Sequence, residues 1–154
     1  MTHHNILIVE DNPGDVELII EMLDELPTME FNIERASRLS EALKTLSQQH
    51  FDINLMDLGL PDSSGLDTLR HLLHEQPKAA VVVITGLADN DTGLESLKSG
   101  AQDYLVKGSI DSDLLNRTIS HATERKQAEI ALKNEQKLLY TLMNNIPDLI
   151  YFKD

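Results

Sequence analysis

The sequence predicts an α/β fold in which a doubly wound parallel sheet is covered by helices on both faces. Short apolar runs rich in β-branched residues recur along the first 120 residues, and segments of helical period separate them. One of these runs, Val81–Ile84, is apolar at every position, which suits a strand buried on both faces. Regular alternation of strand and helix gives right-handed crossovers and therefore parallel strands.

Five strands and four amphipathic helices follow from these periods. The predicted strands are Asn5–Val9, Phe31–Arg35, Ile53–Asp57, Ala80–Thr85 and Asp103–Val106. The apolar helix faces are Val16, Ile19, Ile20 and Leu23; Leu39, Ala42, Leu43 and Leu46; Leu66, Leu69, Leu72 and Leu73; and the shorter pair Leu94 and Leu97. Asn12-Pro13 opens the first helix as a cap followed by proline at N1, and Gly100 ends the fourth helix.

Asn54 interrupts the third apolar run. A buried amide needs a partner, so we interpret Asn54 as a hydrogen-bonded core or edge residue.

Residues 111–145 predict a long fifth helix, because helix-forming residues continue there without Gly or Pro, and Pro147 ends the pattern. Alternating three- and four-residue steps form a heptad-like seam, which indicates a short coiled coil. The alternative is a single helix whose stripe packs on its own domain. The seam consists of Ala128, Leu132, Glu135, Leu139, Leu142 and Ile146.

Length and charge narrow the functional classes. A chain of 154 residues accommodates one domain plus a tail. Its formal charge of −13 disfavours nucleic acid and anionic membranes as partners of the whole chain. Cysteine is absent, which excludes disulfides and thiolate chemistry, and neither a signal peptide nor a membrane span is recognisable. We therefore expect a cytoplasmic protein.

Reactive side chains follow four of the five predicted strands. Glu10 and Asp11 follow the first strand, Asp57 ends the third, Thr85 ends the fourth and Lys107 follows the fifth. Because parallel strands end at the same edge of a sheet, and ligands of such sheets bind at that edge, we expect these side chains to converge.

Three converging carboxylates repel one another, and a divalent cation relieves that repulsion. Few protein ligands, all of them oxygens, suit Mg²⁺ (or Mn²⁺), held by Glu10, Asp11, Asp57 and the carbonyl of Gly59. Asp57 would be the nucleophile toward a phosphoryl group. Lys107 would add positive charge and Thr85 a hydroxyl hydrogen bond.

With these residues, the sequence resembles the response regulator receiver domain of two-component signalling. The matching segments are ILIVEDNPGD, DINLMDLGLPDSSGLD, VVVITGLAD and GAQDYLVKG, and the likeness covers residues 1–122. The resemblance implies a flavodoxin-like (βα)5 sheet in the order 2-1-3-4-5 with an extended C-terminal helix. It implies Asp57 as phosphoacceptor, Glu10 and Asp11 as metal ligands, Thr85 and Lys107 on the phosphoryl group, and Tyr104 as an aromatic switch residue. The implied partners are a histidine kinase or phosphotransfer protein, and a second copy of the chain through the fourth helix, fifth strand, fifth helix and linker.

Two positions depart from the family pattern. Gly108 stands where the family usually has proline, so the loop after the fifth strand is expected to take a different path. Gly59 and Leu87 stand where rapidly dephosphorylating relatives often carry polar side chains, so we expect slow loss of phosphate.

The last residues, NNIPDLIYFKD, resemble the opening of a PAS domain. The expected organisation is a receiver domain over 1–122, a helical signalling linker over 123–146, and the start of a PAS domain over 147–154. The linker would carry the phosphorylation state to a PAS-linked output, such as a sensor kinase or diguanylate cyclase.

Two other functions compete with a receiver that catalyses only its own modification. A Mg²⁺-dependent phosphohydrolase generally has a second Asp two residues after its nucleophile, where this chain has Gly59. A pseudo-receiver that only binds partners is disfavoured by the complete set of reactive residues. His121 and the pair His71 and His74 are interpreted as surface residues.

Overall fold

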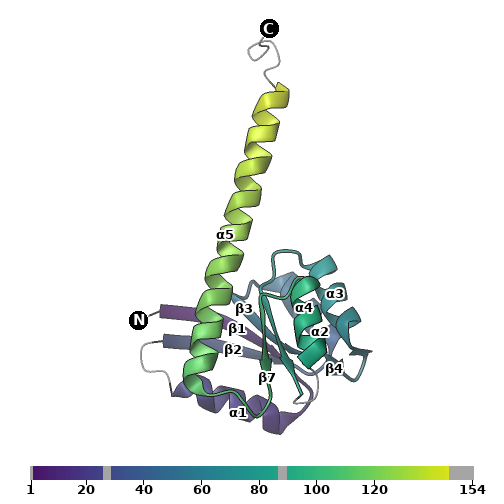
Figure 1. Cartoon of the computed structure of the whole chain (residues 1–154), viewed down its shortest axis with the longest axis vertical. Coiled ribbons are helices and arrows are strands. Elements are labelled where there is room, and N and C mark those ends of the chain that lie inside the picture. The colour runs from purple at the N-terminus through teal and green to yellow at the C-terminus, as the bar shows by residue number, and fades with distance from the viewer. Residues whose placement is uncertain (1, 26–28, 87–89, 146–154) are drawn as a thin grey trace.

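Five parallel strands form the central sheet of the computed structural model, which describes residues 2–25, 29–86 and 90–145 (Figure 1). The strands lie in the order β2-β1-β3-β6-β7. Counted along the chain without a small separate hairpin, this is the expected order 2-1-3-4-5, which is confirmed. The bounds are β1 Thr2–Val9, β2 Met29–Ala36, β3 Ile53–Asp57, β6 Val81–Thr85 and β7 Asp103–Val106.

The strand register aligns the carboxyl ends at one edge of the sheet. Val9 of β1 pairs with Met56 of β3, and Asp57 pairs with Ile84 of β6. Thr85 in turn pairs with Val106 of β7. The residues that end or directly follow these strands are therefore neighbours, as parallel pairing requires.

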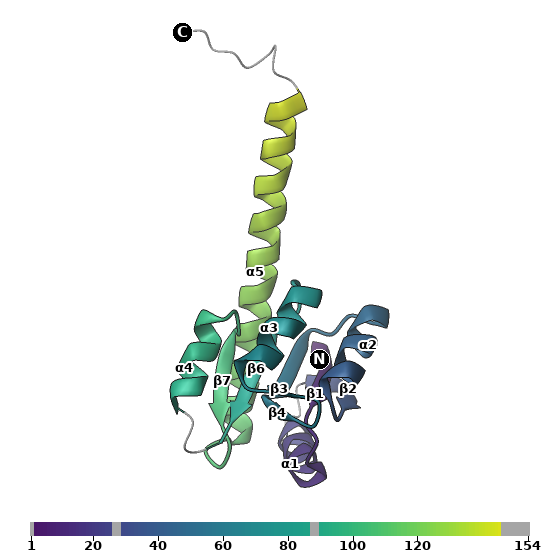
Figure 2. The same ribbon diagram turned by 90° about the vertical axis from the view of Figure 1, so that its right-hand side faces the viewer.

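Helices cover both faces of the sheet (Figures 1 and 2). Successive strand residues point to opposite faces, and apolar residues on each face pack against these helices. Ile6, Ile8 and Leu55 face α1 and α5, whereas Leu7 and Met56 face α2 and α3. The remaining helix, α4, lies on the same face as α2 and α3 (Figure 2). The helix bounds are α1 Pro13–Asp24, α2 Leu39–Gln48, α3 Leu66–Glu75, α4 Asn90–Lys98 and α5 Ser112–Asn145.

The predicted apolar faces of α1, α2 and α3 lie in the core, as buried or partly buried residues. In α4 the pattern differs, because Leu94 is 52% exposed and Leu97 is exposed as well. Between Asp91 and Lys98, the buried residues of this helix are Gly93 and Ser96. The leucines of α4 are therefore available at the surface.

A two-stranded hairpin that the sequence did not predict follows β3. It consists of β4, Gly59–Leu60, and β5, Ser63–Ser64. Between its strands Asp62 accepts hydrogen bonds from the backbone N–H groups of Leu39 (2.8 Å) and Ser40 (3.0 Å). These bonds lower the pKa of Asp62 and cap the N-terminus of α2, where Arg38 supplies no side-chain cap.

The long helix α5 begins in the core and then projects away from it (Figures 1 and 2). Leu115, Ile119 and Ala122 are fully buried, whereas every residue from 131 to 145 is exposed. Leu139, a seam residue, is 55% exposed, and Leu132 and Leu142 are exposed too. The alternative in which this seam packs on its own domain is therefore wrong for residues 131–145. Ile146, Pro147 and the segment likened to a PAS domain lie outside the described residues.

Asn54 and the three helix histidines lie where the sequence analysis placed them, Asn54 in the core and the histidines at the surface. Asn54 is fully buried and donates from Nδ2 to the carbonyl of Ala80 at 3.0 Å. His71, His74 and His121 are exposed. Among residues 2–25, 29–86 and 90–145, no helix has the length and apolar character needed to cross a membrane.

Candidate functional site

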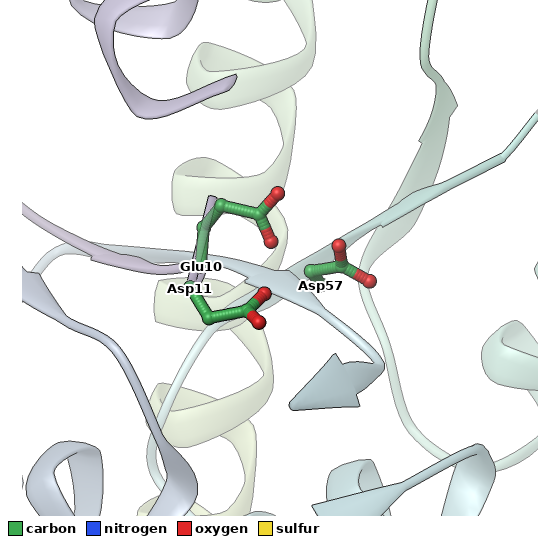
Figure 3. Close-up of side chains that lie close together, drawn as sticks. All are labelled: Glu10, Asp11 and Asp57. Atoms are coloured by element: carbon green, nitrogen blue, oxygen red, sulfur yellow. The ribbon is translucent and has the colours of Figure 1, made fainter. Parts of the chain in front are cut away.

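Three carboxylates from two strands meet at the carboxyl edge of the sheet (Figure 3). Glu10 and Asp11 directly follow β1, and Asp57 is the last residue of the neighbouring β3. One oxygen of each lies within 4.8 Å of the others. Glu10 is only 6% exposed, while Asp11 is exposed. The predicted acidic set is thus brought together, with one member in the protein interior and one facing solvent.

Lys107 carries its ammonium group into this acidic set from the end of β7. Its Nζ lies 2.8 Å from Oδ2 of Asp57 and 3.0 Å from Oε1 of Glu10. A third bond, of 2.9 Å, reaches Oδ2 of Asp15 in the first turn of α1. Charge-assisted bonds of this length are strong, so Lys107 holds β1, β3 and α1 together at the site.

Burial leaves Glu10 in an unfavourable position as an anion, although Glu10 shares the bond to Lys107 with Asp57 and Asp15. Burial raises its pKa to about 9, with the nearby Asp57 and Asp15 adding to the effect and Lys107 opposing it. For Asp57, burial also disfavours the charge, but the neighbouring Glu10 carboxyl group and the bonds from the Gly59 N–H and Lys107 outweigh it and keep the pKa below its ordinary value. The same surroundings therefore raise the pKa of Glu10 and lower that of Asp57, so Glu10 holds a proton more readily than Asp57 does.

Partial burial opposes the charge of Lys107, yet its bonds to Asp57, Asp15 and Glu10 raise its pKa above the ordinary value. The hydrogen bond from Lys107 is in turn the main cause that lowers the pKa of Asp15. The lysine is therefore a permanent cation at neutral pH.

The oxygen atoms present fit a magnesium ion. Glu10 is one of the three carboxylates of the acidic set. Its Oε2 atom is buried and has no hydrogen-bond partner among the described residues. A buried oxygen without a partner is costly unless something binds it. Oxygens on opposite sides of a Mg²⁺ ion are about 4.2 Å apart, so small side-chain shifts would bring Glu10, Asp11 and Asp57 to bonding distance.

The segment after Asp57 is tied back onto it. The backbone N–H of Gly59 donates to Oδ1 of Asp57 at 2.9 Å, so both oxygens of Asp57 have partners. This bond keeps Gly59 beside the carboxylate. The role of its carbonyl as a metal ligand stays a prediction.

Thr85 and Tyr104 lie on adjacent strands. Thr85 ends β6, is 5% exposed, and its hydroxyl donates to the carbonyl of Leu105 in a long bond of 3.4 Å. Tyr104, on β7, is partly buried against the core cluster that includes Leu7 and Met56. A long, weak hydroxyl bond is easily exchanged for another acceptor, which leaves Thr85 able to change partner.

Asp15 is a member of this site that the sequence reasoning missed. It occupies the third position of α1, and the side chain of Asn12 accepts hydrogen bonds from the N–H groups of Gly14 (2.8 Å) and Asp15 (3.3 Å). This cap starts the helix where Asp15 faces Lys107. An acidic residue in a first helical turn is common for dipole reasons alone, so the sequence offered no specific signal.

The loop after β7 has a backbone conformation at Gly108 that a proline could not adopt. Gly108 has φ +88°, a left-handed conformation that proline cannot adopt, and no peptide bond of the described residues is cis. Glycine at this position is therefore matched to its backbone conformation.

A parallel α/β sheet whose carboxyl edge carries an acidic cluster and one bridging lysine is typical of a class of protein, the flavodoxin-like α/β domains with a charged site at the strand ends. Comparison with known proteins identifies the family. Residues 6–119 match the family model of the response regulator receiver domain. The chain belongs to this family and is the receiver domain of a two-component response regulator.

Known relatives agree with this assignment. The response regulator protein PilR of Pseudomonas aeruginosa is 33% identical over 129 residues, which are 84% of this chain but 28% of PilR. A response regulator receiver domain from Clostridium thermocellum has a TM-score of 0.70 at 28% identity, covering 81% of this chain and 98% of the other. A beryllofluoride-activated NtrC4 receiver domain dimer has a TM-score of 0.69 at 27% identity, covering 79% and 98%. The chain therefore spans less than a third of the length of PilR.

Proposed function

We propose that this chain accepts a phosphoryl group on Asp57 from the phosphohistidine of a histidine kinase or phosphotransfer protein, with Mg²⁺ bound beside it. The observation that carries the proposal is the contact of Lys107 Nζ with Asp57 Oδ2 inside a set of three carboxylates. A lone acidic residue at a strand end would be a turn residue, but a low-pKa aspartate between a fixed cation and a metal-binding set is suited to phosphoryl transfer.

In the transfer, an oxygen of Asp57 forms a bond to phosphorus. The bond from phosphorus to the imidazole nitrogen breaks, and its electron pair stays on the nitrogen. Lys107 neutralises charge on the transferred oxygens, and Thr85, whose present hydroxyl bond is weak, donates to one of them. Mg²⁺, held by Glu10, Asp11 and Asp57, supplies charge neutralisation of the phosphoryl oxygens when bound.

The surface beside the site offers a place for the donor. A cavity of about 150 Å³ runs from Asp57 and Lys107 along α1 and is lined there by Leu18, Ile19 and Met22. Leu18 is exposed. A donor helix could cover this apolar lining while its phosphohistidine points at Asp57, because apolar anchors beside a polar centre are usual at interfaces.

Phosphorylation is proposed to move Thr85 and Tyr104 and so to shift a two-state balance in α4, β7 and α5. Receiver domains often dimerise, and the exposed Leu94 of α4 and seam residues of α5 give this chain surfaces for it. Because α5 is one uninterrupted helix to Asn145, a change at its base can reach the linker.

A PAS-linked output remains a prediction, since residues 147–154 lie outside the described structure. Several relatives are named as transcriptional regulators, among them the transcriptional regulatory protein ZraR of Escherichia coli. A DNA-binding output is therefore the second candidate for the protein to which this domain belongs.

The test is intact mass spectrometry after incubation with acetyl phosphate, with and without Mg²⁺. We expect one phosphoryl adduct that needs Mg²⁺, is lost in Asp57→Asn and persists in Asp67→Asn, a control at an exposed acid of α3. No adduct under any condition would favour the pseudo-receiver. Continuous release of phosphate from small phosphate esters would favour the phosphohydrolase, against which Gly59 argues.

A further inference from the structure

The ring of Tyr104 lies against the backbone of α4 at Gly93. A Cβ atom at Gly93 would be 2.4 Å from Cδ2, 2.6 Å from Cε2 and 2.9 Å from Cγ of Tyr104. Contacts this short are not tolerated between carbon atoms. Gly93 is buried, so the ring occupies the volume that any other side chain would need.

The helix is fixed at this same point. Ser96, fully buried, donates from Oγ to the carbonyl of Gly93 at 2.6 Å. On the strand side, the backbone N–H of Tyr104 donates to Oδ1 of Asp103 at 2.8 Å, because β7 is an edge strand. Both partners of the ring contact are thus held by their own local hydrogen bonds.

Glycine is an unfavourable residue for the interior of a helix, second only to proline. A helix of nine residues that carries glycine at a buried position has a packing requirement there. The ring of Tyr104 explains this requirement, since the three atoms nearest to a Cβ at Gly93 all belong to that ring.

We infer that Gly93 is a positioning residue for Tyr104, and that it couples the position of this ring to the position of α4. A ring that turns away uncovers helix backbone and leaves an unfilled space, which α4 must move to close. The contact itself is independent of the proposed phosphorylation. Only the trigger that turns the ring rests on the proposed function.

The inference predicts the sign of the stability change when Gly93 is replaced by alanine. In a helix position without close neighbours, Gly→Ala raises the folding equilibrium constant by about fivefold. Gly93→Ala is instead expected to lower the urea midpoint of the chain, because the new methyl group meets the Tyr104 ring. In a Tyr104→Ala background the same substitution is expected to raise the folding equilibrium constant by about fivefold.

The four proteins of this cycle are compared by urea unfolding, with Leu94→Ala as a control at the exposed neighbouring position of α4. The reversal of sign between backgrounds supports the inference, and it stays measurable even where Gly93→Ala alone folds poorly. Stabilisation in both backgrounds would overturn it. Equal destabilisation in both would overturn it too, because some other neighbour would then oppose the methyl group.

Coupling to α4 has its own readout in ¹H–¹⁵N NMR spectra. Without any phosphoryl mimic, Gly93→Ala is expected to move α4 and β7 resonances in the direction that wild type takes with beryllofluoride and Mg²⁺. Shifts confined to the neighbours of the new methyl group would overturn the coupling. If wild type shows no response to beryllofluoride, the proposed function fails while the stability cycle still decides the contact.

Discussion

The ammonium group of Lys107 lies 2.8 Å from Oδ2 of Asp57, and the same group bonds to Glu10 and Asp15. The cation that would meet a phosphoryl group therefore already occupies the acidic set. It also neutralises part of the charge that attracts a metal, so lysine and metal compete electrostatically. We therefore expect the stability of the domain, its affinity for Mg²⁺ and its proposed phosphorylation to be linked through this one side chain.

Lys107→Met is expected to tighten Mg²⁺ binding by about tenfold. A unit charge and a divalent ion about 5 Å apart repel by about 1.7 kcal/mol at the dielectric constant of water, and the substitution removes this repulsion. Titration calorimetry measures the affinity, with Lys98→Met, in the last turn of α4, as the control. Weaker binding than wild type would show that Lys107 orders the carboxylates rather than competing with the ion.

The metal-free protein is expected to lose stability as pH rises, because of Glu10. The pKa of Glu10 in the folded protein is about 9 against an ordinary value of 4.5, so the folded state keeps a proton that the unfolded chain releases. The stabilising contribution of that proton is complete below about pH 4.5 and is lost as pH rises toward about 9.

Urea midpoints between about pH 5 and pH 8 test this expectation. Glu10→Gln should flatten the decline, and so should saturating Mg²⁺ in wild type, because it binds the anionic form. Glu21→Gln, at an exposed residue of α1, should follow wild type. A decline of the same slope in Glu10→Gln would assign it to other groups.

Phosphorylated Asp57 is expected to persist for minutes or longer, because Gly59 offers no side chain to orient an attacking water. An added Cβ at Gly59 would meet only Asp57 Oδ1, at an ordinary 3.8 Å, so the position tolerates larger residues. Gly59→Asn should speed phosphate loss by roughly tenfold through positioning of water, and Gly59→Ala is the matched control without the amide. A wild-type half-life of seconds would contradict this account of the site; Leu87, the other position concerned, lies outside the described residues.

Activated protein is expected to dimerise through the seam of α5. With beryllofluoride and Mg²⁺, light scattering should report a dimer for wild type and a monomer for Leu139→Asp, because a charge in an apolar seam is costly. Asn134→Asp adds the same charge on the same helix outside the seam and should leave the dimer intact. If Leu139→Asp dimerised as wild type does, the interface would lie elsewhere.

Much of the fold could be predicted from the sequence because apolar residues recur with the periods of strands and helices. Strands β3 and β7 begin and end where the apolar runs predicted. The hairpin of β4 and β5 was not readable, since strands of two residues carry no period. Asp62 was missed as a cap because it is 23 residues from Leu39, the start of the helix that it caps.

The site was readable in part for a related reason. Glu10, Asp57 and Lys107 each follow an apolar run directly, so the topology of a parallel sheet brings them to one edge. Asp15 belongs to a helix turn, and its bond to Lys107, 92 residues away, depends on side-chain conformation. The contact of Gly93 with Tyr104 likewise depends on how closely α4 lies on β7, which no local pattern specifies.

The most direct test of the central claim locates the modified atom. The protein is incubated with acetyl phosphate and Mg²⁺, treated with borohydride, which reduces an aspartyl phosphate to homoserine, and digested for peptide mass spectrometry. The account predicts homoserine at position 57 and none in samples without Mg²⁺. Homoserine at another acidic residue, or an unmodified position 57 in protein that carries a phosphoryl adduct, would contradict it.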